Sequence, residues 1–275
     1  MRITNKKKYL QFQHCTVSYQ IFQTNTSLDK PYIIFIHGFL SSQFSFRKMI
    51  PLLIDKFHII TIDLPPFGDS EKNRNCNFSY RWMAELIIFF MDKLAISKAS
   101  IAGHSMGGQI AMVCAYYYPG RIEKLFLMAP SCYLKKASNL LGLISRLPIS
   151  PYLLRKLFQK IGVKGVLEKC IYFPDLITKR MLAAYRKPFL DKNIYYCLSK
   201  MIRDREGDLN FDCLKAIKLP CVIFWGKKDQ IIPISNGYQL IQHLPNAELC
   251  AITLTGHFLP EEAPEIISEY IKTKT

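Results

Sequence analysis

The sequence predicts an α/β protein, with a mostly parallel central sheet flanked by helices and a helical cap inserted into it. Two observations lead to this class. Short, continuously apolar segments alternate with helical patterns along most of the chain, as in proteins whose parallel sheet is covered on both faces. The alternation stops once, over about 80 residues that carry helical patterns only. A chain of 275 residues can hold one large domain with such an insertion.

The predicted strands are marked by their apolar side chains and by the turns that end them. Residues 9–23 alternate loosely between apolar and polar, which predicts an antiparallel hairpin at the sheet edge. Six further strands are predicted in the segments PYIIFIHGF, FHIITIDLPPFGDS, ASIAGHSMGG, KLFLMAP, PCVIFWGKKD and AELCAITLTGH. Helices are predicted between them, at residues 43–53, 77–94, 106–117, 234–243 and 264–272.

Residues 131–212 form the predicted cap, and residues 1–130 and 213–275 form the predicted core. Within the cap, two groups of apolar residues recur at near-helical spacing, and prolines separate the segments. The first group is Leu140, Leu141, Ile144 and Leu147, and the second is Leu153, Leu154, Leu157, Phe158 and Ile161.

Composition and charge exclude several classes of protein. With 49% apolar and 21% charged residues, the chain is neither disordered, collagen-like nor a coiled coil. The net charge of +16 is uneven, with +4 in residues 1–8 and +9 in residues 131–212. The basic charge of the cap has two interpretations. It is an ordinary solvated face, or it attracts an anionic membrane surface or an acidic acyl carrier protein. No nucleic-acid-binding motif is present, so we expect no nucleic-acid partner.

The cysteines and histidines indicate neither a disulfide scaffold nor a metal site. The nine cysteines are odd in number and scattered, without a CxxC pair, so we expect reduced thiols in a cytoplasmic protein. No His or Cys pair has zinc-site spacing, so no metal is expected. The basic N-terminus is not followed by the apolar stretch of a secretory signal, and no apolar run is long enough to span a membrane.

The motif with chemical meaning is Gly103-His104-Ser105-Met106-Gly107, which fits G-x-S-x-G. It stands where a predicted strand meets a predicted helix, and this context identifies Ser105 as a candidate nucleophile on a sharp turn. Glycines two positions to each side suit such a turn, because the strand and helix backbones nearly touch there.

A serine hydroxyl needs a general base and an orienting carboxylate, in the chain order serine, acid, histidine. His257 follows a predicted strand, whereas His243 falls late in a predicted helix, so His257 is the candidate base. Asp229 follows another predicted strand after a short turn. Glu248 starts a strand at the wrong end, Glu261 and Glu262 follow the histidine, and Asp204, Asp208 and Asp212 lie in or beside the cap.

Acyl transfer also requires donors where negative charge develops on the substrate oxygen. The backbone amides of Met106 and Phe39 are the candidates for this oxyanion hole. Phe39 and Leu40 are expected to line the substrate pocket, and His104 and Phe258 are further candidates for substrate binding. His37 is expected to bond within its own loop.

Together these residues resemble the α/β-hydrolase fold superfamily, in its branch of capped serine hydrolases. The matching stretches FIHGF, DLPPFGDS, GHSMGG, WGKKDQIIP and GHFLPEEAPE cover about residues 9–130 and 213–273. The resemblance implies that Ser105, Asp229 and His257 form a catalytic triad and that substrate binds between sheet and cap. Pro66 stands at the family's first loop glycine, so that loop is expected to follow a different path. Branches with aspartate as nucleophile, such as epoxide hydrolases and haloalkane dehalogenases, are disfavoured by Ser105.

The expected function is cleavage of carboxylic esters or thioesters by a serine carboxylesterase, through an acyl-enzyme and without a cofactor. The apolar cap residues suggest an acyl-chain substrate. Four alternatives remain: a methyl esterase acting on an acyl-carrier-protein-linked substrate, a lysophospholipase or monoacylglycerol lipase, a carbon–carbon bond hydrolase, and a non-catalytic binding module.

Overall fold

The computed structural model describes residues 6–23 and 30–274. Its centre is an eight-stranded sheet in the order β1-β2-β4-β3-β5-β6-β7-β8. The pairs β1–β2 and β2–β4 are antiparallel and all other pairs are parallel. The strands are β1 Lys7–Phe12, β2 Cys15–Phe22, β3 Tyr32–Ile36, β4 His58–Ile62, β5 Ala99–His104, β6 Ile122–Met128, β7 Cys221–Gly226 and β8 Ala247–Ile252. The predicted fold class, with its hairpin at one edge, is therefore confirmed.

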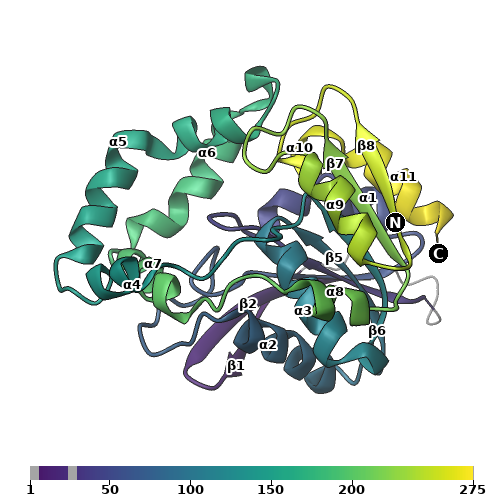
Figure 1. Ribbon diagram of the computed structural model, residues 1–275, viewed down its shortest axis with the longest axis horizontal. Helices are drawn as coiled ribbons and strands as arrows, with labels where there is room; N and C mark the ends of the chain where they lie inside the picture. The colour runs from purple at the N-terminus through teal and green to yellow at the C-terminus, as the bar shows by residue number, and fades with distance from the viewer. Residues whose placement is uncertain (1–5, 24–29, 275) are drawn as a thin grey trace.

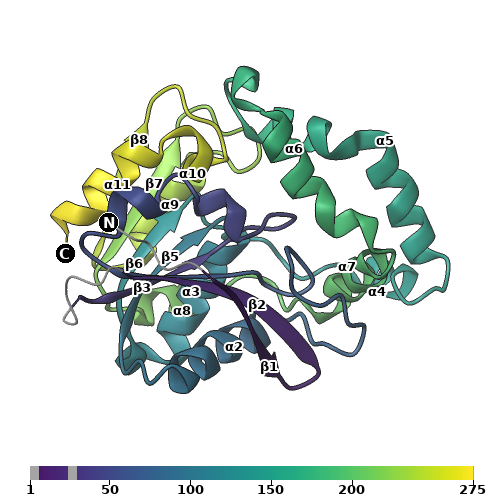
Figure 2. The same ribbon diagram turned by 180° about the vertical axis from the view of Figure 1, so that it is seen from behind.

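Helices cover both faces of this sheet (Figures 1 and 2). One face carries α2 (Tyr80–Lys93), α3 (Met106–Tyr117), α8 (Phe211–Ala216) and α9 (Ser235–His243). The other carries α1 (Ile50–Leu53) and α11 (Pro264–Thr273), with α10 (Leu259–Glu262) against the 3-10 turn η1 (Gln43–Phe46). Every residue of β4, β5 and β7 is buried, which explains their continuously apolar sequences.

Residues 131–212 hold helices and no strand. They are α4 (Asn139–Ile144), α5 (Ser150–Cys170), α6 (Lys179–Arg186) and α7 (Asn193–Asp204), with short 3-10 turns at Pro174–Leu176 and Lys187–Leu190. These helices form a group of their own beside the sheet, where α5 packs against α6 and α7 (Figure 1). Helix α8 crosses position 212 and packs against α3 and α9.

One predicted helix is wrong in extent. Residues 43–53 form η1 and the four-residue α1 rather than one helix. Gln43 begins η1, where its backbone and side-chain amides both donate to Asp63. Pro51 is the second residue of α1, and a proline has no amide hydrogen to continue a helix from an earlier turn. Helix α2 begins later than predicted, at Tyr80, because the Ser79 side chain caps it by accepting from the Trp82 amide.

Cys15 and Cys76 form a disulfide with a Cα–Cα distance of 5.8 Å, so the prediction that all cysteines are reduced is wrong for this pair. The bond joins β2 to the loop before α2 and closes a loop with a sequence separation of 61. The other seven cysteines are free thiols: Cys114, Cys132, Cys170, Cys197, Cys213, Cys221 and Cys250.

Two sequence features bear on the surface of the molecule. Of the basic N-terminal segment 1–8, residues 1–5 lie outside the described residues, and Lys7 pairs with Asp69. Among the helices of residues 6–23 and 30–274, none is both long and apolar enough to cross a membrane.

The disulfide predicts a defined thiol count. We expect the unfolded, unreduced protein to react with seven equivalents of iodoacetamide, because Cys15 and Cys76 are already bonded to each other. After reduction, all nine should react. Mass spectrometry of the alkylated protein gives both numbers, and nine modifications before reduction would contradict the disulfide.

Candidate active site

Ser105 occupies the single-residue turn between β5 and α3. Its backbone has φ 51° and ψ −117°, a conformation that is strained for a residue with a side chain. Two hydrogen bonds hold this turn. The Ser105 amide donates to the Met128 carbonyl at 2.9 Å, and the Ser105 carbonyl accepts from the Ser131 amide at 2.9 Å. The end of β6 and the chain after it therefore fix the turn.

The glycines on either side of this turn have no room for a side chain. A Cβ on Gly103 would lie 2.4 Å from the Gly107 carbonyl oxygen, and one on Gly107 would lie 2.1 Å from the Ile36 carbonyl oxygen. These distances are far inside van der Waals contact. The close approach of α3 to β5 and β3 thus explains both glycines of the G-x-S-x-G motif.

The structure brings Ser105, His257 and Asp229 together in one hydrogen-bonded chain. His257 Nδ1 lies 2.7 Å from Asp229 Oδ2, and His257 Nε2 lies 3.0 Å from Ser105 Oγ. A carboxylate only accepts, so Nδ1 carries the proton and Nε2 is free to accept from the serine hydroxyl. The other Asp229 oxygen accepts from the amides of Ile231 and Ile232, at 2.8 and 2.9 Å, which fixes its orientation.

The loop that carries His257 is held by contacts that the sequence did not predict. The His257 amide donates to the Cys170 carbonyl at the end of α5, at 2.7 Å, and the Phe258 amide donates to the same carbonyl at 3.1 Å. Glu262, rejected as a triad member, instead accepts from the amides of Tyr172, Gly256 and Phe258. No side-chain pattern could have revealed the role of a backbone carbonyl.

His104 is buried beside this site and stacks on the Phe258 ring. Its Nε2 lies 2.8 Å from the His257 carbonyl oxygen and so carries a proton, whereas its Nδ1 has no hydrogen-bond partner among the described residues. Burial, with His257 nearby, lowers the pKa of His104 to about 3. Its imidazole is therefore neutral over the physiological range.

The loop after β3 lies against the serine. A Cβ on Gly38 would be 3.1 Å from the Ser105 Cβ, so the next residue, Phe39, has its backbone close to the nucleophile candidate. Met106 is the first residue of α3, where an amide has no partner within the helix. His37 bonds within its loop, as expected, with Nδ1 2.8 Å from the Gly38 carbonyl oxygen, and its Nε2 accepts from the Leu64 amide at 2.9 Å.

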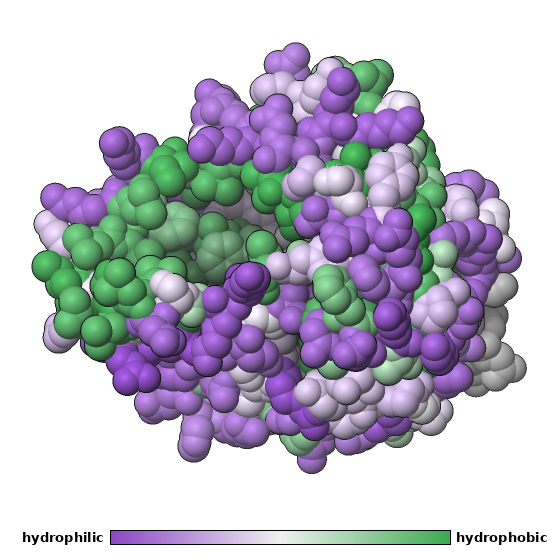
Figure 3. Space-filling model, in the orientation of Figure 1, coloured by the Kyte–Doolittle hydropathy of each residue, from purple (hydrophilic) through white to green (hydrophobic). Residues whose placement is uncertain are grey.

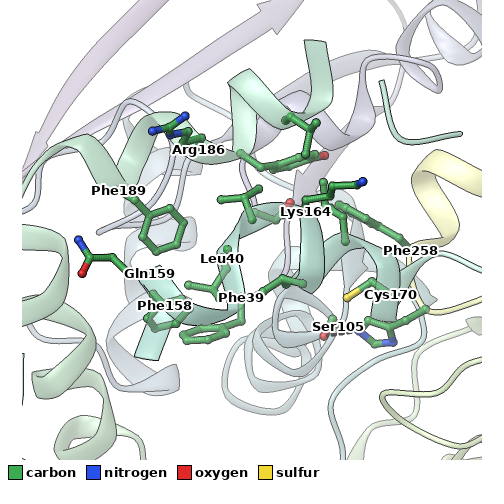
Figure 4. Close-up of a pocket in the computed structure, with 18 of the residues that line it drawn as sticks. Phe39, Leu40, Ser105, Phe158, Gln159, Lys164, Cys170, Arg186, Phe189 and Phe258 are labelled. Atoms are coloured by element: carbon green, nitrogen blue, oxygen red, sulfur yellow. Dashed lines mark hydrogen bonds between the residues drawn. The ribbon is translucent and has the colours of Figure 1, made fainter. Parts of the chain in front are cut away.

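A cavity of about 560 Å³ opens between the sheet and helices α5 and α6. Figure 3 shows the hollow and the hydrophobic residues around it, and Figure 4 shows Ser105 at one end with Phe158 and Phe189 toward the other. All four residues predicted to bind substrate (Phe39, Leu40, His104 and Phe258) line it. Helices α5 and α6 add apolar side chains and three cations, Arg155, Lys164 and Arg186.

Three of the alternatives considered from the sequence lie elsewhere: His243, Glu248 and Asp208. His243 is 3.0 Å from the Tyr133 hydroxyl, and Glu248 pairs with Lys274. Asp208 accepts from Ser131 and from the Leu134 amide where the chain leaves the sheet. Within residues 6–23 and 30–274, no group of three or more His, Cys, Asp or Glu side chains is placed to hold a metal ion.

Comparisons with known proteins agree on the fold. A family model described as the alpha/beta hydrolase fold matches residues 31–166 and 170–264. "Uncharacterized hydrolase YugF" of Bacillus subtilis (strain 168) is 41% identical over 239 residues, covering 87% of this chain and 88% of that protein. "Monoacylglycerol lipase ABHD6" of Homo sapiens is 22% identical over 256 residues, covering 88% and 74%. The crystal structure of haloalkane dehalogenase DbeA from Bradyrhizobium elkani superposes with TM-score 0.80 at 19% identity, covering 98% of this chain and 97% of that one.

The close approach of backbones at Gly107 predicts a severe cost for any side chain there. We expect Gly107→Ala to lower the free energy of unfolding by more than about 3 kcal/mol, because the methyl group would overlap the Ile36 carbonyl. Gly120→Ala is the matched control, since a Cβ at Gly120 has nothing within 4 Å, and its effect should stay within about 0.5 kcal/mol. Urea unfolding measures both, and equal stabilities would contradict the packing.

The low pKa of His104 predicts acid-sensitive stability. The unfolded chain takes up a proton near the ordinary pKa of 6.5, whereas folded His104 takes one up only near 3. Stability should therefore fall as the pH drops from about 6.5 toward 3, with a slope of up to about 1.4 kcal/mol per pH unit for this residue. His37, whose pKa burial also lowers, adds to this slope. Urea unfolding from pH 7 to 4.5 should show a shallower slope for His104→Gln, and an unchanged slope would refute this assignment.

Proposed function

We propose, since the chain belongs to the α/β-hydrolase fold family, that this hydrolase cleaves carboxylic esters with Ser105 as nucleophile. The observation that carries the proposal is the hydrogen-bonded chain Ser105–His257–Asp229 at the end of a largely apolar cavity. This arrangement joins a nucleophile, a base and an orienting acid.

In the proposed mechanism, Ser105 Oγ attacks the ester carbonyl carbon while His257 Nε2 takes the hydroxyl proton. Asp229 holds the imidazole in the required tautomer and stabilises the imidazolium. The amides of Met106 and Phe39 donate to the oxyanion, and losing one such donor typically costs about 3 kcal/mol. The tetrahedral intermediate collapses to an acyl-enzyme, and His257 gives its proton to the leaving alcohol. Water, deprotonated by the same imidazole, then releases the acid.

The cavity lining supports an acyl chain as the acid part of the substrate. Leu167, Phe158, Phe189 and Val163 present apolar surface along it, and a chain in their midst is removed from water. These four side chains also pack in or against the hydrophobic clusters of the protein, so they stabilise the cap as well as line the cavity.

One alternative is favoured by a particular observation. Arg155, Lys164 and Arg186 line the cavity, and no carboxylate does so within the described part of the chain. Cationic side chains suit a substrate with a phosphate group, as in a lysophospholipid, better than a neutral glyceride. We therefore place a lysophospholipid ester second to a simple acyl ester. Methyl esters on an acyl carrier and carbon–carbon cleavage have no such observation in their favour.

The proposal predicts that activity depends on Ser105. We expect hydrolysis of p-nitrophenyl esters, compared from acetyl to palmitoyl, to peak at medium or long chains because of the apolar cavity. Ser105→Ala and His257→Ala should each lower kcat at least about a thousand-fold, and Asp229→Asn somewhat less.

The exposed Ser235→Ala serves as the matched control and should retain activity and labelling by a fluorophosphonate probe. Folded protein that the probe does not label at Ser105 would overturn the mechanism and favour a binding module. Labelling combined with faster turnover of vinylogous diketones than of any ester would instead favour carbon–carbon cleavage.

A further inference from the structure

Large exposed hydrophobic side chains gather on one part of the cap. Of the 22 such residues in the described chain, 11 fall within residues 134–161. Helix α4, the turn after it and the first half of α5 carry most of them, including Leu140, Leu143, Leu147, Ile149, Leu153 and Leu157. Their exposures reach 67% at Leu140. We call residues 139–161 the apolar cap face, and such a patch on a monomer usually marks a binding surface.

The charge of this segment is of one sign. Residues 131–167 contain seven basic side chains and no acidic one. On α5, Lys156 and Lys160 are exposed and lie on the same helical face as Leu153 and Leu157, at spacings of three and four residues. Among the described residues, no carboxylate lies within ion-pair distance of either lysine. Cations are thus interleaved with exposed aliphatic side chains.

Helix α5 separates this surface from the cavity. Arg155, Phe158 and Gln159 line the cavity, whereas Leu153 and Leu157, from the same turns, do not line it and are half exposed. Figure 3 shows the same relation, with hydrophobic residues at the left of the molecule, over α4 and α5, adjoining the hollow. A surface that held the apolar cap face would therefore lie beside the cavity.

We propose that the apolar cap face docks on an anionic phospholipid bilayer, with α4 and the first half of α5 in the interface. Aliphatic side chains enter the acyl boundary, while Lys156 and Lys160 extend along it so that their ammonium groups reach the lipid phosphates. Charge complementarity selects this occupant. In a symmetric dimer this cationic segment, which contains no acidic residue, would face the same segment of the second copy, and like charges repel. An acidic protein would match the charge, but its acidic groups would not cover the broad aliphatic surface of the face.

The docking proposal is independent of the ester-hydrolase proposal, so binding is measured without turnover. Ser105→Ala protein is mixed with vesicles of phosphatidylcholine alone or of equal parts phosphatidylcholine and phosphatidylglycerol, and sedimented. We expect binding to the anionic vesicles that weakens with salt, and little binding to the zwitterionic ones.

Two double variants locate the surface. Leu153→Glu/Leu157→Glu should weaken binding to the anionic vesicles about ten-fold or more, and so should Lys156→Glu/Lys160→Glu. The control is Tyr238→Glu/Ile266→Glu, whose residues are exposed to a similar extent (51% and 52%, against 50% for each leucine) but lie on α9 and α11. It should bind as the parent does. Circular dichroism verifies that each variant is folded.

Several outcomes would overturn the docking proposal. One is the absence of binding to anionic vesicles by the parent protein. Another is equal weakening by the control variant, which would mean that no particular face docks. Light scattering that finds a dimer dispersed by Leu153→Glu/Leu157→Glu, with no vesicle binding, would assign the face to a second copy. The two proposals can be told apart by making the same double variants with Ser105 intact. If these variants lose vesicle binding but still cleave soluble esters, the docking proposal is supported and the ester-hydrolase proposal stands.

Discussion

The approach of the first turn of α3 to the ends of β3 and β5 is the constraint on which the site depends. Gly107 lies so near the Ile36 carbonyl, and Gly103 so near Gly107, that the chain must reverse within one residue. That residue, Ser105, accepts a strained backbone and is held by hydrogen bonds from the end of β6. The same turn starts α3 at Met106 and lays the Gly38 loop against the serine. One packing contact thus orders the nucleophile candidate and the amides around it.

Much of the fold could be predicted from the sequence because the buried strands leave little freedom in residue type. β4, β5 and β7 are buried at every position, so each appears as a continuous apolar run. The extent of the helix predicted at 43–53 was wrong, because the start of this segment is fixed by a residue distant in the sequence: Gln43, the first residue of η1, donates to Asp63 from its backbone and its side chain. The pairing of Cys15 with Cys76 was missed for a similar reason, since it joins residues far apart in the chain.

The candidate site was predictable where side chains follow strand ends and not where the backbone does the positioning. Ser105, Asp229 and His257 each stand just after a strand of the parallel part of the sheet, and the carboxyl ends of such strands share one edge. Chain order then separated Asp229 from Glu261 and Glu262. Chain order does not predict that Glu262 accepts hydrogen bonds from three amides. Residue identity does not predict that the Cys170 carbonyl accepts from the amides of His257 and Phe258. Both contributions needed the three-dimensional structure.

The Cys170 carbonyl ties the end of α5 to the segment that carries the His257 imidazole. It accepts from the amides of His257 and Phe258, so the last turn of α5 cannot move away from the sheet without releasing the segment that carries the base candidate. Displacement of the last turn of α5 and alignment of the imidazole are therefore coupled. A ligand that shifts the last turn of α5 therefore also biases the position of His257, and by reciprocity a change in the position of His257 biases that turn. The cavity under α5 and the candidate triad are thus linked through a single backbone carbonyl.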